Sequence, residues 1–186
     1  MDWLNEPPDW AETDGVLTVV TGERTDFWRK THYGFIRDDG HFRHTAAPVE
    51  FSASVSFRGE YEELYDQAGL MLRLDATIWI KTGIEFVAGR RMLSAVVTRD
   101  FSDWSTMPMP VDAAWVRLRL TRIGGTVHVH WAAEPEPDTW RMLRLAWFPP
   151  GGAARVGPMC CSPQRAGFRV EFRDFALGPP AQPEEQ

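Results

Sequence analysis

The chain has 186 residues, nine tryptophans, eleven phenylalanines and a formal net charge of −6 at pH 7. This length predicts one domain, and the acidic balance argues against nucleic acid as a partner, because phosphate binding needs a basic patch. No apolar run approaches the roughly 20 residues of a membrane span, and no secretory signal opens the sequence. We therefore expect a cytoplasmic protein that binds no membrane.

Short apolar segments, alternating or β-branched, recur along the chain and predict β-strands. They lie at residues 16–21, 49–57, 68–74, 78–86, 92–98, 115–122, 126–131, 140–148, 155–161 and 168–175. Residues 1–14 are acidic and Pro-rich, and we expect Trp3 and Trp10 to pack onto the domain. Residues 21–45 and 99–110 lack clean periodicity and are predicted as loops, the first with a short strand or hairpin.

About ten to twelve strands of this spacing, with no helical periodicity, predict an all-β fold. The architecture that we expect is an antiparallel two-sheet β-sandwich over residues 1–177. Residues 178–186 are rich in Pro and Glu, and we expect them to form a disordered tail. The sequence leaves monomer and homodimer open.

The segment from Tyr65 to Glu85 shows the clearest alternation. Apolar residues occupy every second position from Ala68 to Leu74, and Ile78, Ile80, Ile84 and Phe86 share one face, which predicts one buried face and one open face. The open face carries Gln67, Trp79, Lys81 and Glu85. Lys81 and Glu85 lie four residues apart, about 13 Å along a strand, so each is expected to find a partner elsewhere.

Metal, cofactor and nucleophile signals are weak. The five histidines lack the spacing and the neighbouring carboxylates of a metal site, so we expect no metal and no cofactor. Cys160 and Cys161 are adjacent, and their side chains should point to opposite faces of a strand, which disfavours a disulfide between them. No Gly-x-Ser-x-Gly motif or Gly-rich phosphate loop occurs, and we assign no catalytic residue.

Several residues fit a carbohydrate site, which needs aromatic faces and planar hydrogen-bonding groups. Trp28, Trp79 and Trp104 supply faces, although core packing is the alternative interpretation of each. Hydrogen-bonding groups come from Asp26, Gln67, Lys81, Glu85 and Asp103. The loops that carry Trp28 and Trp104 are expected to form walls over a floor made by the polar face of the central strands.

Several phrases of the sequence resemble one family of about 190 residues. They are TDFWRKTHYGF (25–35), YDQAGLMLRLD (65–75), WIKTGIEF (79–86), VVTRDFSDWS (96–105) and VGPMCCSPQRAGFRVEFRDF (156–175). The family is similar to concanavalin-A-like lectins and glucanases and includes a regulator of enolase. The resemblance covers nearly the whole chain. It implies a jelly-roll sandwich with its ligand site on a concave sheet face, but no activity, because fold does not fix function.

Three functional hypotheses follow. We favour a binding domain, not an enzyme, that holds a carbohydrate or polyol on the concave face. The first alternative is a glycan-acting hydrolase or lyase that uses Glu85 with Asp26, Asp66 or Asp103 as a pair of carboxyl groups. The second, in line with the family resemblance, is an interaction module with a protein partner that regulates a metabolic enzyme and presents an exposed apolar patch.

Overall fold

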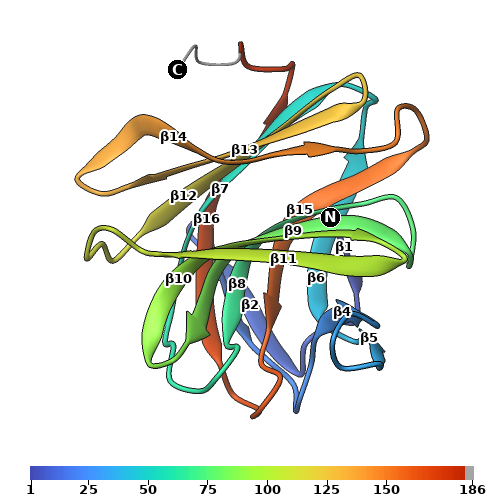
Figure 1. Ribbon diagram of the computed structural model, residues 1–186. Coiled ribbons are helices and arrows are strands. Elements are labelled where there is room, and N and C mark those ends of the chain that lie inside the picture. Colours follow the sequence, from blue (N-terminus) through green and yellow to red (C-terminus); the bar gives the residue numbers. More distant parts are fainter. Residues whose placement is uncertain (183–186) are drawn as a thin grey trace.

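Two antiparallel seven-stranded sheets form the body of the computed structural model, which describes residues 1–182 (Figure 1). Sheet A has the order β1 (Asp2–Leu4), β6 (His41–Ala47), β15 (Ala154–Cys161), β8 (Gln67–Arg73), β9 (Ile78–Val87), β10 (Arg90–Arg99), β11 (Phe101–Pro108). Sheet B has the order β14 (Glu136–Trp147), β13 (Thr126–Ala133), β12 (Val116–Ile123), β7 (Phe51–Gly59), β16 (Arg169–Gly178), β3 (Val16–Val20), β2 (Asp9–Thr13). The predicted all-β sandwich is confirmed.

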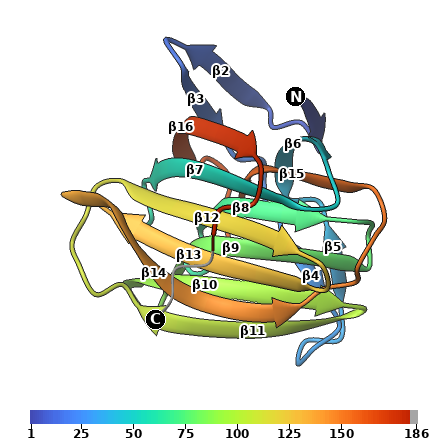
Figure 2. The same ribbon diagram turned by 90° about the horizontal axis from the view of Figure 1, so that it is seen from above.

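The two sheets stack with an apolar core between them (Figure 2). Alternate residues supply it, for example Ala68, Leu70 and Leu72 from β8 and Ile80 and Ile84 from β9. Burial of each large aliphatic side chain stabilises the fold by about 1.5–3 kcal/mol. The alternation seen in the sequence therefore identifies the face of sheet A that points toward sheet B.

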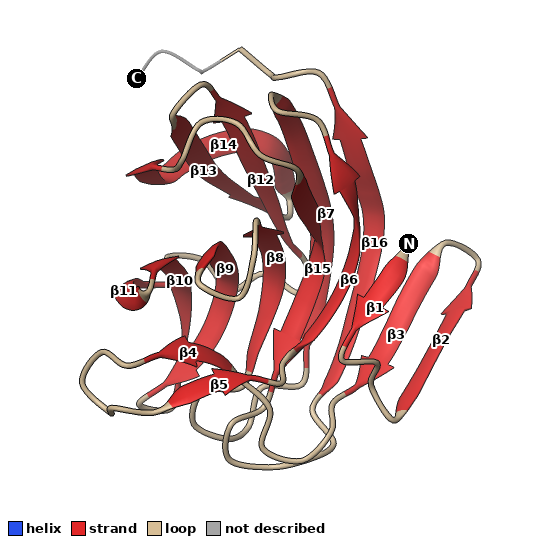
Figure 3. Cartoon of the chain, turned by 90° about the vertical axis from the view of Figure 1, so that its right-hand side faces the viewer, coloured by secondary structure: helices blue, strands red, loops and turns tan. Residues whose placement is uncertain are grey.

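The opposite, outer face of sheet A is not open, and that expectation was wrong. A third element, the hairpin of β4 (Phe27–Arg29) and β5 (Ile36–Asp38), covers part of it (Figure 3). The hairpin contributes Phe27 and Trp28 to an outer cluster of buried residues, whose other members come from sheet A: Phe42, Met71, Trp79, Val96, Met159 and Cys161. Every residue of β8 is consequently buried. The hairpin expected within residues 21–45 is thus present, and it provides a roof.

Three segments outside the predicted strands belong to strands. Residues 41–45, at the end of the first predicted loop, lie in β6. Residues 101–108 form β11, which pairs with β10 along its whole length, and β14 begins at Glu136, ahead of the strand expected at residues 140–148. The strands β11 and β14 lie at sheet edges. Edge strands have one unpaired side and more exposed positions, so they lack the apolar alternation that reveals a central strand.

The chain ends also join the sandwich. The β1 strand pairs with β6 and the β2 strand pairs with β3. Trp3 packs against the core and against the ring of Trp10, with 5.6 Å between ring centroids, as expected. Gly178 ends β16, and residues 183–186 of the predicted tail lie outside the described residues. The described part of the chain has no helix suited to crossing a membrane.

The adjacent cysteines point to opposite faces, as strand geometry requires. Cys160 lies in the core between the sheets, and Cys161 lies in the outer cluster. Both thiols are free and buried. Burial raises the pKa of the Cys161 thiol well above its usual value, so neither geometry nor ionisation favours reactivity there.

Candidate functional site

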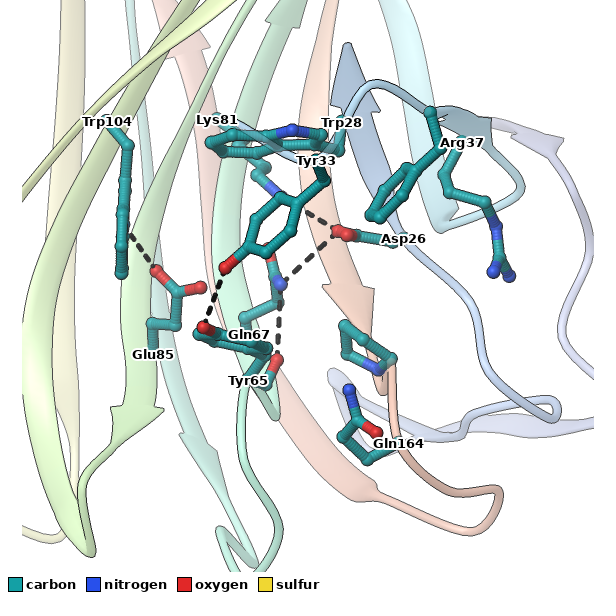
Figure 4. Close-up of a pocket in the computed structure, with 12 residues that line it drawn as sticks. Asp26, Trp28, Tyr33, Arg37, Tyr65, Gln67, Lys81, Glu85, Trp104 and Gln164 are labelled. Carbon is teal, nitrogen blue, oxygen red and sulfur yellow. Dashed lines mark hydrogen bonds and ion pairs between the residues drawn. The ribbon is translucent and has the colours of Figure 1, made fainter. Parts of the chain in front are cut away.

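A cavity of about 310 Å³ opens on the outer face of sheet A, beside the outer cluster (Figure 4). Its size is at the lower end of the range of roughly 300–1,000 Å³ for small-molecule pockets. The lining residues come from the roof hairpin and the residue before it, from β8 and the turn before it, from β9 and β11, and from the loop after β15: Asp26, Trp28, Tyr33, Phe35, Arg37, Tyr65, Gln67, Lys81, Glu85, Trp104, Pro163 and Gln164.

The floor of the cavity is built by strand periodicity. Lys81 and Glu85 project from β9 on the same face because side chains alternate with a period of two, and Gln67 of β8 lies directly opposite Glu85 in the register. Between them Gly69 faces Gly83. A Cβ added to Gly83 would lie 1.9 Å from the carbonyl oxygen of Ala68. Glycine is therefore required where the two strands approach most closely.

An ion pair between Lys81 and Asp26 joins the floor to the chain just before the roof. The Lys81 ammonium donates to Asp26 Oδ1 at 3.0 Å, and the Lys81 side chain is only 4% exposed. Burial by itself would lower the pKa of Lys81. The negative charge of Asp26, with a weaker contribution from Glu85, outweighs the effect of burial, and the pKa of Lys81 is raised. Lys81 is therefore a cation at neutral pH.

Glu85 has a different environment. Its Oε2 accepts hydrogen bonds of 2.8 Å from Ser94 Oγ and 2.8 Å from Trp104 Nε1, both uncharged donors. Burial raises the pKa of Glu85, and the charge on Asp26 adds to this, while Lys81 and the two hydrogen bonds oppose it. None of the described residues donates a hydrogen bond to Oε1, which points toward the cavity in Figure 4.

Gln67 links the two sides of the floor. Its amide nitrogen donates to the Tyr65 carbonyl oxygen at 3.1 Å and lies 3.4 Å from Asp26 Oδ1. Both donor hydrogens are directed at protein oxygens, which leaves the amide oxygen as an acceptor. Together the floor offers a fixed ammonium, a carboxyl oxygen and an amide oxygen to a ligand.

Aromatic rings form the walls. The Trp28 and Trp104 rings are 6.5 Å apart at 88°, and the Tyr65 and Trp104 rings are 6.2 Å apart at 80°. Figure 4 shows Trp28 and Tyr65 on opposite sides of the cavity, with Trp104 along a third side. The Tyr33 hydroxyl meets the Tyr65 hydroxyl at 2.9 Å. This hydrogen bond, with burial, raises the pKa of Tyr65 to about 12, so the phenol stays protonated.

Six of the eight residues proposed from the sequence lie around this cavity: Asp26, Trp28, Gln67, Lys81, Glu85 and Trp104. The other two do not. Trp79 is 1% exposed and packs in the outer cluster against Phe27, so its ring offers no free face. The Asp103 side chain is 62% exposed and lies 3.5 Å from Arg144. It alternates with Trp104 along β11, which directs it away from the cavity.

The sequence interpretation missed the other six lining residues: Tyr33, Phe35, Arg37, Tyr65, Pro163 and Gln164. Four of them had a signal. Tyr33, Phe35 and Arg37 belong to the predicted loop 21–45, which carries Trp28 and was expected to form a wall of the site, and Tyr65 directly precedes the central strands. Pro163 and Gln164 had none, because a loop after a strand cannot be placed over a distant strand without the fold.

The other residues considered for catalysis or metal binding have structural roles. Asp66 is fully buried and is held by Arg165 at 2.7 Å and by the backbone N–H groups of Glu62 and Glu63 at 3.1 Å. His41 accepts a backbone hydrogen bond from Gly22 at Nε2. Within residues 1–182, no three His, Cys, Asp or Glu side chains gather closely enough to hold a metal ion.

The fold and the cavity place the chain among the two-sheet antiparallel sandwiches that carry a pocket on the outer face of one sheet. It belongs to the family described as "Protein of unknown function (DUF1349)", which matches residues 3–180. Regulation of enolase protein 1 of Saccharomyces cerevisiae is 43% identical over 178 residues, which is 96% of this chain and 89% of that protein.

Solved structures agree with the fold. A functionally unknown protein from Saccharomyces cerevisiae matches with a TM-score of 0.92 at 43% identity, over 97% of this chain and 96% of that one. Bacteroides ovatus Xyloglucan PUL GH43B matches with a TM-score of 0.66 at 18% identity, over 90% of this chain and 34% of that one. The alginate lyase from Klebsiella pneumoniae matches with a TM-score of 0.62 at 9% identity, over 94% and 85%. The last two likenesses show the concanavalin-A-like sandwich fold alone.

Proposed function

We propose that the cavity binds a small carbohydrate or polyol. The observation that carries this proposal is the pairing of aromatic faces, from Trp28 and Trp104, with a floor whose polar groups keep unused hydrogen-bonding capacity. Sugars present an apolar C–H face and a rim of hydroxyl groups, and such a site matches both surfaces. Fixed acceptors and donors select hydroxyl positions because a mismatched ligand would leave a buried polar group unpaired.

The proposal is tested by titrating the purified full chain with neutral monosaccharides, disaccharides and linear polyols, followed by calorimetry and by NMR. Binding is expected, and Trp104→Ala should weaken it at least tenfold through loss of one aromatic wall. The matched control is Trp147→Ala, which removes an exposed indole on β14 that does not line the cavity. If no sugar or polyol binds, amino sugars included, or if both variants bind alike, the proposal fails.

A second candidate function is glycan cleavage. One observation favours it: Glu85, whose carboxyl pKa is raised by burial, faces the same cavity as the carboxylate of Asp26. Two carboxyl groups that face one cavity, one of them with a raised pKa, are the arrangement that acid–base catalysis of glycan cleavage uses. Of the other carboxyl groups considered, Asp66 is locked to Arg165 and Asp103 faces solvent. Incubation with oligosaccharides, followed by reducing-end detection, should then show turnover that Glu85→Gln abolishes.

The name of the yeast relative supports a third function, in which the chain regulates a metabolic enzyme through direct contact. Exposed apolar residues beside the cavity mouth would suit such a contact: Tyr33, Phe35, Ile36 and Leu64. Co-purification with enolase from the native cell tests this, with Phe35→Ser as the disrupting variant. If enolase co-purifies with the wild type but not with Phe35→Ser, the interaction is supported. If enolase does not co-purify with the wild type, the interaction is excluded.

A further inference from the structure

The charges around the cavity do not balance. Asp26 and Lys81 neutralise each other across 3.0 Å, and Arg37 at the rim is paired with Asp39 at 2.8 Å. Glu85 remains, 6% exposed, and its hydrogen-bond donors among the described residues are the neutral groups of Ser94 and Trp104. A buried carboxylate without a cation of its own costs free energy unless it is protonated or receives a positive charge from elsewhere.

The tryptophans also differ in whether a cationic side chain lies near the indole ring. Seven of the nine indole rings have an arginine or lysine within 6 Å of the ring centroid: Trp3, Trp10, Trp79, Trp115, Trp131, Trp140 and Trp147. Among residues 1–182 the two exceptions are Trp28 and Trp104, and both line the cavity. This chain covers its indole faces with cations everywhere except where a ligand could do so.

The ring geometry at those two residues suits a cation. Trp28 and Tyr65 each lie close to perpendicular to Trp104 (88° and 80°). They stand on opposite sides of the cavity in Figure 4, and the Glu85 carboxyl group lies between Trp104 and Tyr65. Several ring faces around a single point concentrate the negative potential of the π-systems there. A carboxylate at the same point adds a full charge and a directional acceptor.

We propose that the ligand carries a positive charge, and that it is an amino sugar or a related amino polyol whose ammonium group lies between Glu85 Oε1 and the rings of Trp28, Tyr65 and Trp104. This inference rests on the proposed carbohydrate site and names the class of its ligand. The ammonium donates to Oε1, while the hydroxyl groups face Gln67, Lys81 and Asp26. An N-acetylated or deaminated ligand lacks the charge and leaves Glu85 unpaired.

The test compares glucosamine, N-acetylglucosamine and glucose on the full chain by calorimetry at pH 7. Glucosamine should bind about tenfold or more tightly than the other two, which is the expected gain for a desolvated cation on aromatic rings and a carboxylate. Glu85→Gln keeps an acceptor for Ser94 and the volume of the side chain, and should equalise the three ligands. Circular dichroism of that variant checks that it is folded.

The outcomes separate the two proposals. If glucose binds as tightly as glucosamine, the cation site is wrong and the carbohydrate site stands. If none of the three binds, the carbohydrate site fails, and tetramethylammonium then tests the cation site alone because it carries charge without hydroxyl groups. Quenching of tryptophan fluorescence by tetramethylammonium that disappears in Trp104→Ala would support the cation site, and no quenching would overturn it.

Discussion

Sheet A carries two contrasting regions on one outer face. At one end the roof hairpin supplies Phe27 and closes an apolar cluster around Trp79. At the other end Trp28 of the hairpin and Asp26, the residue just before it, leave a cavity above Lys81 and Glu85. The same strands of sheet A lie under both regions, so the two regions differ in the side chains that pack above the strands. Where those side chains are apolar, the outer face is buried as a second core. Where they are polar and aromatic, the outer face forms a candidate site.

The largest expected effect is on the closed end. Trp79→Ala removes an indole that is 1% exposed, and truncation of a buried aromatic residue costs about 3–5 kcal/mol of the free energy of unfolding. Trp104→Ala, at the open end, should cost about 1 kcal/mol. Chemical denaturation of both variants measures the contrast. Trp79→Phe is the matched control and should retain most of the stability, because the indole N–H of Trp79 has no hydrogen-bond partner among residues 1–182.

The next effect concerns the ion pair at the boundary of the two regions. Lys81→Met leaves Asp26 beneath the roof without its cation, and breaking one partner of a buried pair costs about 3–5 kcal/mol. We expect a value near 3 kcal/mol because the carboxylate reaches the cavity. The double variant Asp26→Asn with Lys81→Met should recover much of this loss. A double variant as unstable as the single one would show that packing, not charge, holds the roof.

The sequence predicts correctly which side chains of one strand share a face. It does not predict which distant segments pack against that face. Period-two alternation placed Lys81 and Glu85 on one face and identified the core positions of β8 and β9. It could not show that Phe27 lies over Trp79, because that contact joins segments about 50 residues apart through the roof. Which aromatic ring packs over which strand face can be known only from the three-dimensional fold. For this reason Trp79 was assigned to the site from the sequence and Tyr65 was omitted.

The third effect is a pH dependence at the open end. The pKa of Glu85 is raised in the folded chain, so the folded state binds more protons than the unfolded state between the unfolded and folded pKa values. Its contribution to stability is therefore largest at low pH and is lost as the pH rises through that interval. Relative to wild type, Glu85→Gln should gain stability as the pH rises from the ordinary pKa of a glutamate toward the raised pKa of Glu85. Equal urea midpoints at every pH would contradict the raised pKa.

The smallest effect belongs to the mouth of the cavity. The Tyr33–Tyr65 hydrogen bond joins two exposed hydroxyl groups across 2.9 Å, so Tyr33→Phe should cost only about 0.5 kcal/mol. Its consequence is local, because the bond holds the tip of the roof hairpin, where Lys30, His32 and Gly34 have positive φ angles. Hydrogen exchange in residues 30–36 should accelerate while the strands of sheet B stay protected. Arg24→Gln is a control that leaves this bond intact. If exchange in Tyr33→Phe matches the wild type, the ring stack of Tyr33 on Phe35, at 5.4 Å, suffices to hold the tip, and the cavity mouth does not depend on the hydroxyl pair.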